Sequence, residues 1–334
     1  MYKTIKINKI IQFMLFFVAL YFLISYSNVN FTSVKTTLEL FLTKVFPSLF
    51  PFILFTEIIL KTNILNTISN VIIKKLFKKT KIKINQNIIP IILIGFLCGF
   101  PMGAKILSKS YLENKISKKE LYILSSFINN CNPIFVISTV GIGIYQNKKI
   151  GIYLLLIHYL TSITFGLIYL ITYNKFNNII YDNKQNLNSF SKKSINTNTK
   201  QNTKFEMLTS SINNSFKTLS LVFGFMIIFN LLGAIISSFF LKFNLNENFS
   251  LILKSIFEFT QGISNVANCN LINIKIKIIF SSFLINFNGL CVIFQLYSYL
   301  HSTKMKLNYV ILLKFLLGIT SIFITIIFLH FIKF

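Results

Sequence analysis

Two charged side chains stand inside apolar segments of this sequence, where a charge is costly and is usually kept for a function. Lys105 directly follows residues 99–104, GFPMGA, and Glu258 precedes the pair Gln261-Gly262, so each lies beside a turn signal. An ammonium group can bind an anionic solute, and a carboxylate can balance that charge or control access to it. We therefore expect Lys105 and Glu258 to face one cavity, with Lys105 contacting an anionic substrate. The alternative is an ion pair that only holds two hairpins together.

Asparagines interrupt two further apolar segments, 121–145 and 276–300, at corresponding places. The first interruption ends in Pro133 and the second in Gly289. Proline removes a backbone donor from a helix, and asparagine offers both a donor and an acceptor. A helix broken in this way exposes a half-helix N-terminus with partial positive charge, which suits an anionic solute. The alternative is that the amides only join helices by hydrogen bonds.

The predicted substrate site combines these amides with the two charged side chains and with turn residues, whose glycines let a backbone approach a ligand closely. Its members are Gly99, Pro101, Gly103, Lys105, Asn129, Asn130, Asn132, Glu258, Gln261, Gly262, Asn286 and Asn288. The sequence contains no metal-ligand spacing, no phosphate-binding glycine loop and no nucleophile–histidine–acid set. We therefore expect no catalytic residue, no metal and no cofactor, and hence no enzyme.

Other ionisable groups in the apolar segments have simpler interpretations. Glu57 is expected to pair with Lys61, one helical turn later. His158 is open to two interpretations, a proton relay and a hydrogen-bonded packing role. The lysines near segment ends are expected to extend their ammonium groups to the membrane surface: Lys44, Lys254 and Lys314.

The composition indicates what surrounds these residues. Of the 334 residues, 54% are hydrophobic, 38 are Phe and only 13% are charged, whereas about a quarter of an average soluble chain is charged. The net charge of +26 rests on lysine without a single arginine. Because arginine is the usual reader of phosphates and guanine edges, we expect no nucleic acid partner. The chain is predicted to be a polytopic membrane protein in contact with a lipid bilayer.

Nine apolar segments set the predicted topology: about 10–26, 38–60, 88–108, 121–145, 150–173, 215–241, 249–270, 276–300 and 308–332. If all of them cross the membrane, the lysines divide almost evenly between its two sides. If 88–112 and 249–270 are instead re-entrant hairpins, most lysines fall in loops on the side of the N-terminus, which makes that side cytoplasmic. Each hairpin arm spans roughly 16 Å, enough to reach the bilayer midplane.

The two halves of the chain are related in sequence. Residues 125–137, SSFINNCNPIFVI, and 281–293, SSFLINFNGLCVI, share seven of thirteen residues. A unit of span, re-entrant hairpin, broken span and span contains three crossings, so the second unit is inverted relative to the first. Inverted repeats with broken helices are typical of secondary transporters.

We therefore expect an all-α polytopic membrane protein with such an inverted repeat, preceded by one extra N-terminal span. Its predicted parts are the N-terminal span (1–35), the first repeat (36–173), a polar linker (174–214) and the second, inverted repeat (215–334).

Four motifs resemble a known family in their order and spacing: FPSLFPF at 46–52, GFPMGAK at 99–105, SFINNCNPIF at 126–135 and HYL at 158–160. They resemble the YlbJ-type sporulation integral membrane proteins of the nucleoside-recognition (Gate) domain group. That group is distantly similar to concentrative nucleoside transporters. The second half matches more loosely, through Glu258, Gly262, Asn288-Gly289 and Gln295.

This resemblance implies a role in endospore formation, in the outer forespore membrane, where dipicolinic acid moves out of the mother cell. A flat pyridine dicarboxylate suits a mid-membrane lysine, helix N-termini and amides. A dianion leaving a negative cytoplasm gains about 2.3 kcal/mol per charge per 100 mV, so passive export would suffice. The alternatives are a nucleoside or other small-solute secondary transporter and a non-transporting membrane scaffold of sporulation. The sequence leaves a homo-oligomer open.

Overall fold

The computed structural model describes residues 13–14, 17, 20–62, 64–72, 85–176, 204–242, 252, 254–269 and 272–331. Every regular element within these residues is a helix, which confirms the predicted all-α class. In chain order the elements are α2 (Ser27–Leu40), η1 (Phe41–Val45), α3 (Phe46–Leu60), α4 (Ile64–Ile72), α5 (Ile88–Leu97), α6 (Met102–Leu112), α7 (Lys118–Phe127), η3 (Phe135–Ile144), α8 (Lys148–Phe176), α9 (Lys204–Lys242), α11 (Phe259–Asn268), α12 (Ile274–Phe287), α13 (Gly289–Leu300), η4 (His301–Thr303) and α14 (Leu307–Phe331).

Five helical stretches in the described residues are long and apolar enough to cross a membrane: Ser27–Leu60, Lys148–Tyr169, Lys204–Phe240, Ile274–Thr303 and Leu307–Phe331. Many large apolar side chains on these stretches are exposed, as lipid-facing side chains are. The polytopic membrane class is thereby confirmed. Most of the predicted first span, 10–26, lies outside the described residues.

The first long stretch is one continuous helix made of α2, η1 and α3, and it begins at Ser27 rather than at the predicted residue 38. Polar side chains of its early part bond to their own helix; Thr37 donates to the Ser33 carbonyl at 2.7 Å. The helix widens to a π-helix at η1, directly before Pro47. Because proline cannot donate to the carbonyl of the preceding turn, this widening lets the helix continue past it.

α5 and α6 form a helical hairpin whose tip is the turn at 98–101. Gly99 in this turn has φ +73°, and a Cβ there would lie 2.6 Å from the backbone nitrogen of Asn132. At the open end of the hairpin, the Asn85 side chain donates to the Lys115 carbonyl at 2.9 Å, so the chain enters and leaves at one place. The predicted hairpin fold is present, while its entry into a bilayer from one side stays a prediction.

The second hairpin turns at Glu258, and the predicted turn at Gln261-Gly262 is wrong. Residues 254–257 are helical, Glu258 is extended with φ −135° and ψ 113°, and α11 begins at the next residue. The Glu258 carboxylate accepts hydrogen bonds from the backbone N–H groups of Thr260 and Gln261. A side chain that caps a helix in this way fixes its start, which places the predicted turn pair inside α11.

Both predicted breaks are present. Residues 128–132 have no helical structure between α7 and η3. Asn288, with φ 69° and ψ 0°, separates α12 from α13. Asparagine is one of the few residues besides glycine that tolerates this left-handed conformation, so a single residue ends the helix there.

α8 and α9 extend into the predicted polar linker, 174–214, from both ends. α8 continues to Phe176, and α9 begins at Lys204, so residues 204–214 are helical rather than a linker. The hydroxyls of Ser211 and Ser215 each donate to a carbonyl one turn earlier at 2.7 Å, which accommodates polar residues in a helix. The middle of the predicted linker, 177–203, lies outside the described residues.

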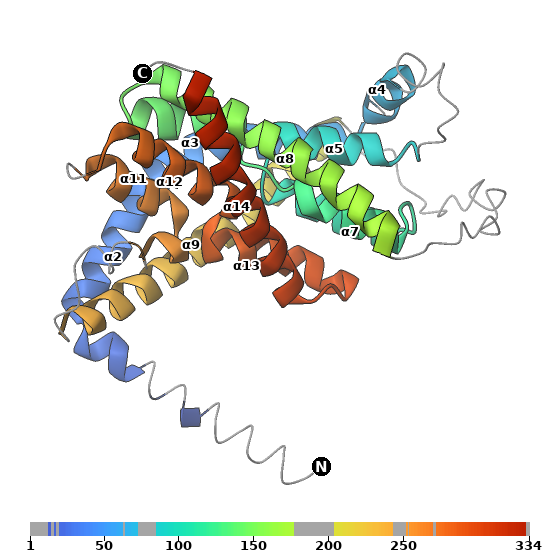
Figure 1. The fold of residues 1–334 in the computed structure, drawn as a ribbon. Coiled ribbons are helices and arrows are strands. Elements are labelled where there is room, and N and C mark those ends of the chain that lie inside the picture. The colour runs from blue at the N-terminus through green and yellow to red at the C-terminus, as the bar shows by residue number, and fades with distance from the viewer. Residues whose placement is uncertain are drawn as a thin grey trace, which may run out of the picture.

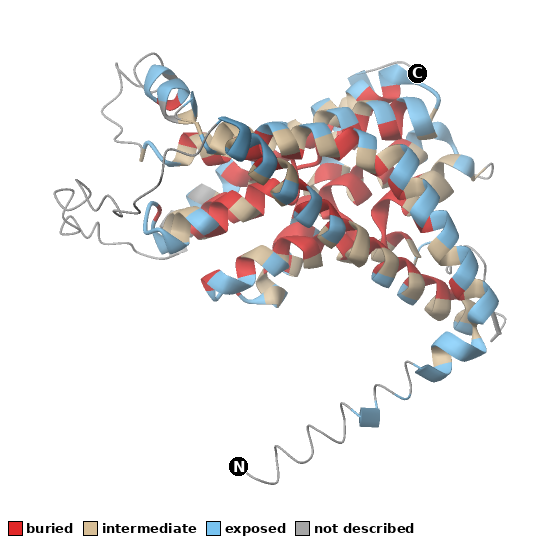
Figure 2. Ribbon diagram, turned by 180° about the vertical axis from the view of Figure 1, so that it is seen from behind, coloured by how far each residue is buried: buried red, intermediate tan, exposed pale blue. Residues whose placement is uncertain are grey.

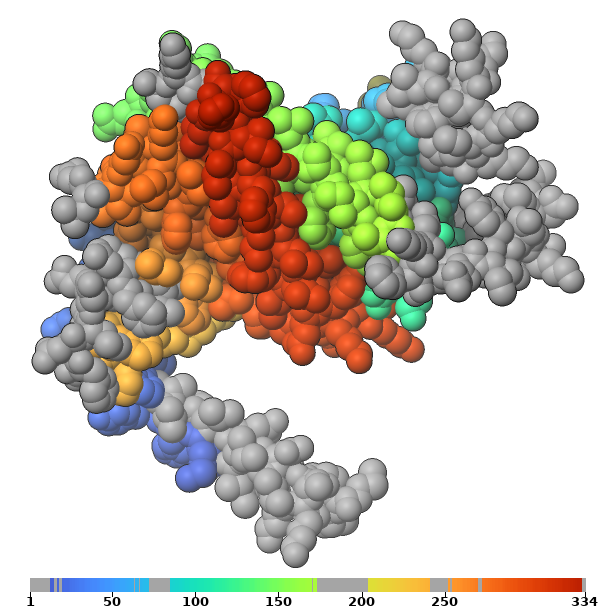
Figure 3. Space-filling view, in the orientation of Figure 1, coloured from blue at the N-terminus to red at the C-terminus, as the bar shows by residue number. Residues whose placement is uncertain are grey.

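The two halves of the chain pack into each other. α8 packs on α7 and η3, α14 packs on α12, and α8 and α14 also pack together; α14 occupies the outer face beside both neighbours in Figures 1 and 3. The second arm of each hairpin reaches the other half, because α6 packs on α13 and α11 packs on η3. Buried residues concentrate where these elements meet, and exposed residues lie on the outer sides of the long helices (Figure 2).

Candidate functional site

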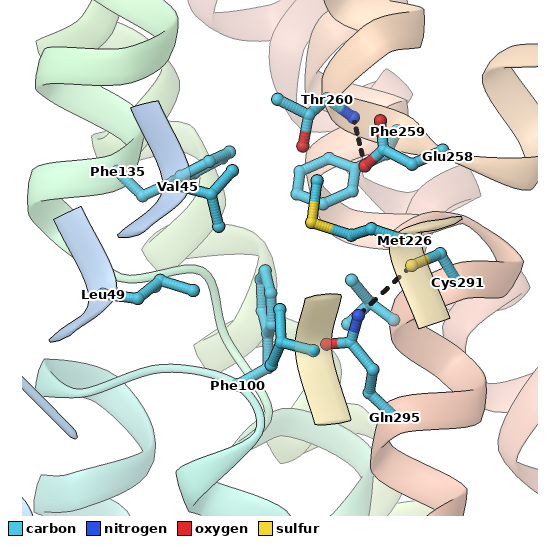
Figure 4. Close-up of a pocket in the computed structure, with 12 residues that line it drawn as sticks. Val45, Leu49, Phe100, Phe135, Met226, Glu258, Phe259, Thr260, Cys291 and Gln295 are labelled. Atoms are coloured by element: carbon cyan, nitrogen blue, oxygen red, sulfur yellow. Dashed lines mark hydrogen bonds between the residues drawn. The ribbon is translucent and has the colours of Figure 1, made fainter. Parts of the chain in front are cut away.

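A small pocket, with room for about one water molecule in this conformation, lies where the two hairpin tips meet the broken helices (Figure 4). Its walls are mostly apolar, with a few polar side chains among them. The lining residues are Val45, Leu49, Phe100, Phe135, Val222, Met226, Glu258, Phe259, Thr260, Cys291, Val292 and Gln295. Apolar walls with a few placed polar groups are typical of sites for small molecules.

The pocket is lined from both predicted repeats. Val45, Leu49, Phe100 and Phe135 belong to 36–173, and the other lining residues belong to 215–334; in the alignment of 125–137 with 281–293, Phe135 stands opposite Cys291. The rings of Phe100 and Phe259, one from each hairpin tip, meet edge to face with centroids 5.8 Å apart. The pocket therefore lies between the two predicted repeats. Transporters built from inverted repeats hold their substrates at such an interface.

Glu258 is the one charged side chain among the described residues that line the pocket. The residue is 1% exposed, and its carboxylate accepts from the N–H groups of Thr260 at 3.1 Å and Gln261 at 2.7 Å. These two N–H groups belong to the first turn of α11. The start of a helix carries a partial positive charge, which makes a negative charge favourable there. The helix N-terminus that suits an anionic solute is therefore occupied by a carboxylate of the protein itself.

Gln295 presents its amide to the same pocket (Figure 4). The residue is 1% exposed; its Nε2 donates to the Cys291 sulfur at 3.2 Å, and its Oε1 has no partner among the described residues. A buried acceptor left unpaired costs about 1–3 kcal/mol. The two ends of an amide exchange places by a flip, and the Cys291 thiol is able to donate. Gln295 can therefore offer either an oxygen or an NH₂ group to a solute.

Lys105 does not share this pocket with Glu258. Its ammonium group lies 2.6 Å from Oε1 of Glu57 on α3 and 3.3 Å from the Thr218 hydroxyl on α9. Glu57 thus bonds to Lys105 rather than to Lys61, which contacts α9 instead. Neither predicted pairing is present. Lys105 lies one turn beyond the tip, and its side chain reaches Glu57 on α3 and Thr218 on α9 rather than the second hairpin.

The first break is both hydrogen-bonded and partly unsatisfied. The Asn130 carbonyl accepts from the N–H of Phe100 in the hairpin tip at 2.9 Å, and the Asn132 side chain accepts from the Ile134 N–H at 2.8 Å. Three other buried amide atoms have no partner among the described residues, Asn129 Oδ1, Asn130 Nδ2 and Asn132 Nδ2. Unpaired buried groups of this kind point to bound water or solute. These three atoms can therefore bond to water or to a solute, and the binding role of the amides stays a prediction.

The second break is tied to the first half through His158. Asn286 Oδ1 lies 2.8 Å from His158 Nδ1, and His158 Nε2 accepts from the Cys131 N–H at 2.9 Å. Because Nε2 accepts, Nδ1 carries the ring proton and donates it to Asn286. Of the two interpretations of His158, the hydrogen-bonded packing role fits this geometry. Asn288 donates to the Ile285 carbonyl at 2.8 Å, while its Oδ1 lacks a partner among the described residues.

Lys314 on α14 does not extend to the membrane surface as predicted. The residue is 2% exposed, and its Nζ donates to the Asn129 carbonyl in the first break at 2.7 Å. The sequence similarity between the two halves indicates that Lys314 is buried. When residues 125–137 and 281–293 are aligned, Lys314 in the second half stands where His158 stands in the first.

The predicted turn residues pack the hairpins rather than line the pocket. A Cβ on Gly99 or Gly103 would lie 2.6 or 2.9 Å from a backbone atom of the first break, and Gly262 packs as closely on the first arm of its own hairpin. Pro101 lies in the first tip. Of the predicted site residues, Glu258 alone lines the pocket. In the described part of the chain, no group of three or more His, Cys, Asp or Glu could hold a metal ion.

Comparison with known proteins finds the sporulation integral membrane protein YlbJ of Bacillus subtilis (strain 168). It is 27% identical over 344 residues, which cover 94% of this chain and 81% of that protein. No family model matches the chain. No solved structure matches it either. The similarity supports the YlbJ-type family assignment and a membrane role in sporulation.

Proposed function

We propose that this YlbJ-type integral membrane protein is a secondary carrier, and that its solute is dipicolinate, moved out of the mother cell across the outer forespore membrane. One observation carries the transport proposal. A pocket lies between two hairpin tips and two broken helices, lined by residues of both predicted repeats. Broken backbone deep in a membrane protein is tolerated only where it is buried in protein or lines a cavity, and a passive scaffold has no use for it.

The residue types that line the pocket suit a flat aromatic solute with polar edges, which would enter once the hairpin tips move apart. Phe100, Phe135 and Phe259 offer ring faces and edges, and Gln295 offers an amide. The two N–H groups at the start of α11 can receive a carboxylate once Glu258 is displaced from them or protonated. Dipicolinate, a planar ring with two carboxylates, matches this combination.

The driving force for such export needs no nucleotide. A dianion leaving a negative cytoplasm gains about 2.3 kcal/mol per charge per 100 mV. A carrier that alternately opens the pocket to each side is sufficient, and movable hairpins are one way to do this.

A nucleoside is the second candidate solute, and Glu258 is the observation that favours it. A carboxylate in the pocket is an acceptor for ribose hydroxyls, and its negative charge opposes the entry of a dianion. The same aromatic walls suit a nucleobase.

The test is the dipicolinate content of mother cell and spore fractions in a strain that lacks this gene. We expect dipicolinate to be made at the normal level but to remain in the mother cell. A strain that carries the intact gene at another locus is the control. Normal dipicolinate in the spores of the deletion strain would refute dipicolinate transport.

A further inference from the structure

The two breaks, residues 128–132 and Asn288, lie against each other, and we call this place the crossing. We propose that Lys314, in place of Lys105, supplies the fixed positive charge that an anionic solute meets there. This inference rests on the proposed transport of an anion. It identifies a residue that determines the charge of the accepted solute.

The charge of Lys105 is already compensated. Its ammonium group lies 2.6 Å from a Glu57 oxygen, and the Glu57 side chain is only 6% exposed, so the pair is shielded from water on the carboxylate side. Asn214 donates to the other Glu57 oxygen at 3.2 Å, which fixes the carboxylate in place. A solute carboxylate would have to displace Glu57 to reach Lys105.

Lys314 has no such counterion. No carboxylate forms an ion pair with it among the described residues, and its recorded acceptor is the peptide carbonyl of Asn129 at 2.7 Å. A buried, uncompensated ammonium group in a membrane helix is costly and usually marks a path for a substrate or ion. The Asn129 carbonyl belongs to the first break, so the charge lies within the crossing itself.

The equivalent position in the first half contributes no charge. His158 accepts from the Cys131 N–H through Nε2 and donates through Nδ1 to Asn286, an arrangement open only to the neutral ring. The two equivalent positions therefore differ in charge, and of the pair only Lys314 can supply a cation to the crossing.

A chain of contacts connects this charge with the pocket. Asn288 in the second break donates to the sulfur of Cys131 in the first break at 3.4 Å. Gly289 follows, and a Cβ on it would lie 3.1 Å from the backbone nitrogen of Phe259 at the second hairpin tip. Because electrostatic interactions are long-ranged in a water-poor interior, Lys314 need not touch a solute in the pocket to attract it.

A structural role for Lys314 is the competing explanation. The Asn129 carbonyl lies just beyond the end of α7, where a cation stabilises the partial negative charge of a helix C-terminus. The two roles differ in what they predict. A structural role affects every solute equally, whereas a fixed charge discriminates between solutes that differ only in charge.

The experiment measures uptake by the full chain in proteoliposomes for three solutes of nearly the same shape: dipicolinate (two charges), its monoamide 6-carbamoylpyridine-2-carboxylate (one charge) and pyridine-2,6-dicarboxamide (none). Lys314→Gln keeps a donor for the Asn129 carbonyl and removes the charge, and Lys314→Arg keeps the charge. For Lys314→Gln we expect dipicolinate uptake to fall about tenfold or more and dicarboxamide uptake to be unchanged. Lys314→Arg should retain the preference for dipicolinate. The matched control, Lys105→Gln, should lower uptake of all three solutes alike or leave it unchanged.

The outcomes separate this inference from the proposed function. Equal loss of all three solutes in Lys314→Gln, whether by misfolding or otherwise, would assign Lys314 the structural role and overturn the inference. Unchanged dipicolinate uptake would overturn it as well. Wild-type protein that moves nucleosides but no pyridine carboxylate would refute dipicolinate transport, and the inference would fall with it.

Discussion

At the scale of single residues, Glu258 is the side chain that distinguishes the two proposed solutes. Its carboxylate occupies the two N–H donors that open α11, and it is the one charged group among the described lining residues. For a dianion, this carboxylate is a competitor for the same donors. For a nucleoside, it is a partner for hydroxyl groups. The two candidate solutes therefore predict opposite effects of neutralising it.

Glu258→Gln distinguishes the two candidates. Gln retains an oxygen for the Thr260 or Gln261 N–H but carries no charge, so dipicolinate uptake in proteoliposomes should be retained or rise severalfold as the repulsion is lost. Nucleoside uptake, which depends on a charged acceptor, should fall about tenfold. Glu113→Gln, in the exposed loop after α6, makes the same charge change outside the pocket and should alter neither uptake. Loss of dipicolinate uptake in Glu258→Gln alone would contradict the competitor role.

Residue types with a local signal were predictable from the sequence, but their partners were not. The sequence indicates a special role for polar residues within apolar segments, such as Asn130, Asn132 and Glu258. The partner of Lys105 depends on which helices border α6, and the burial of Lys314 depends on where α14 crosses the first break. Both follow from packing between segments far apart in the chain, which residue spacing does not encode.

At the scale of elements, the hairpin tips depend on backbone geometry that only certain residues allow. Gly99 has φ +73° and sits against the first break, with the Asn132 backbone nitrogen 2.6 Å from where a Cβ would be. Any side chain there strains the backbone and pushes the tip away from the break. The position of Phe100 in the pocket depends on this contact.

Gly99→Ala is expected to destabilise the protein and to lower transport. The left-handed backbone alone costs alanine about 1–2 kcal/mol, and the clash with Asn132 adds to it. Thermal unfolding in detergent should show a clearly lower midpoint than for wild type. Gly224→Ala is the control, because a Cβ on Gly224 in α9 meets nothing within 4 Å and alanine favours helix by up to about 1 kcal/mol. Equal midpoints for the two variants would show that the tip tolerates a side chain.

Elements were predictable where proline, glycine and asparagine mark a change of direction. Such residues mark the turn at 98–101 and the two breaks, at 128–132 and at Asn288. The structure contains the turn and both breaks at these positions. The second tip was misplaced because the Gln261-Gly262 pair looks like a turn, whereas the Glu258 cap moves the turn three residues earlier. The helical start of α9 was missed because serine and asparagine resemble a linker until their hydrogen bonds to the helix are seen.

At the scale of the whole molecule, hydrogen bonds across the two halves agree with the predicted inverted topology. The Ser108 and Ser302 hydroxyls lie 2.9 Å apart, at segment ends that the topology places in the cytoplasm. The Tyr145 and Ser281 hydroxyls lie 2.8 Å apart, near segment ends that it places on the opposite side. Asn85 joins the two ends of the first hairpin. A topology in which 88–112 crossed the membrane would put Asn85 and its partner Lys115 on opposite sides, so this contact favours the predicted re-entrant hairpin.

Cysteine labelling tests this arrangement in cells. Single cysteines at Lys115 and Lys306 should react with a membrane-impermeant maleimide only after permeabilisation, and those at Lys148 and Lys275 should react in intact cells. All four positions are exposed. The background carries Cys269→Ala, because the other native cysteines are buried. Because Asn85 holds both ends of the first hairpin together, labelling of position 115 in intact cells would place that whole end outside the cytoplasm and contradict the predicted topology. The two halves would then not be inverted copies, and the proposed alternate opening of the pocket would lose its structural basis.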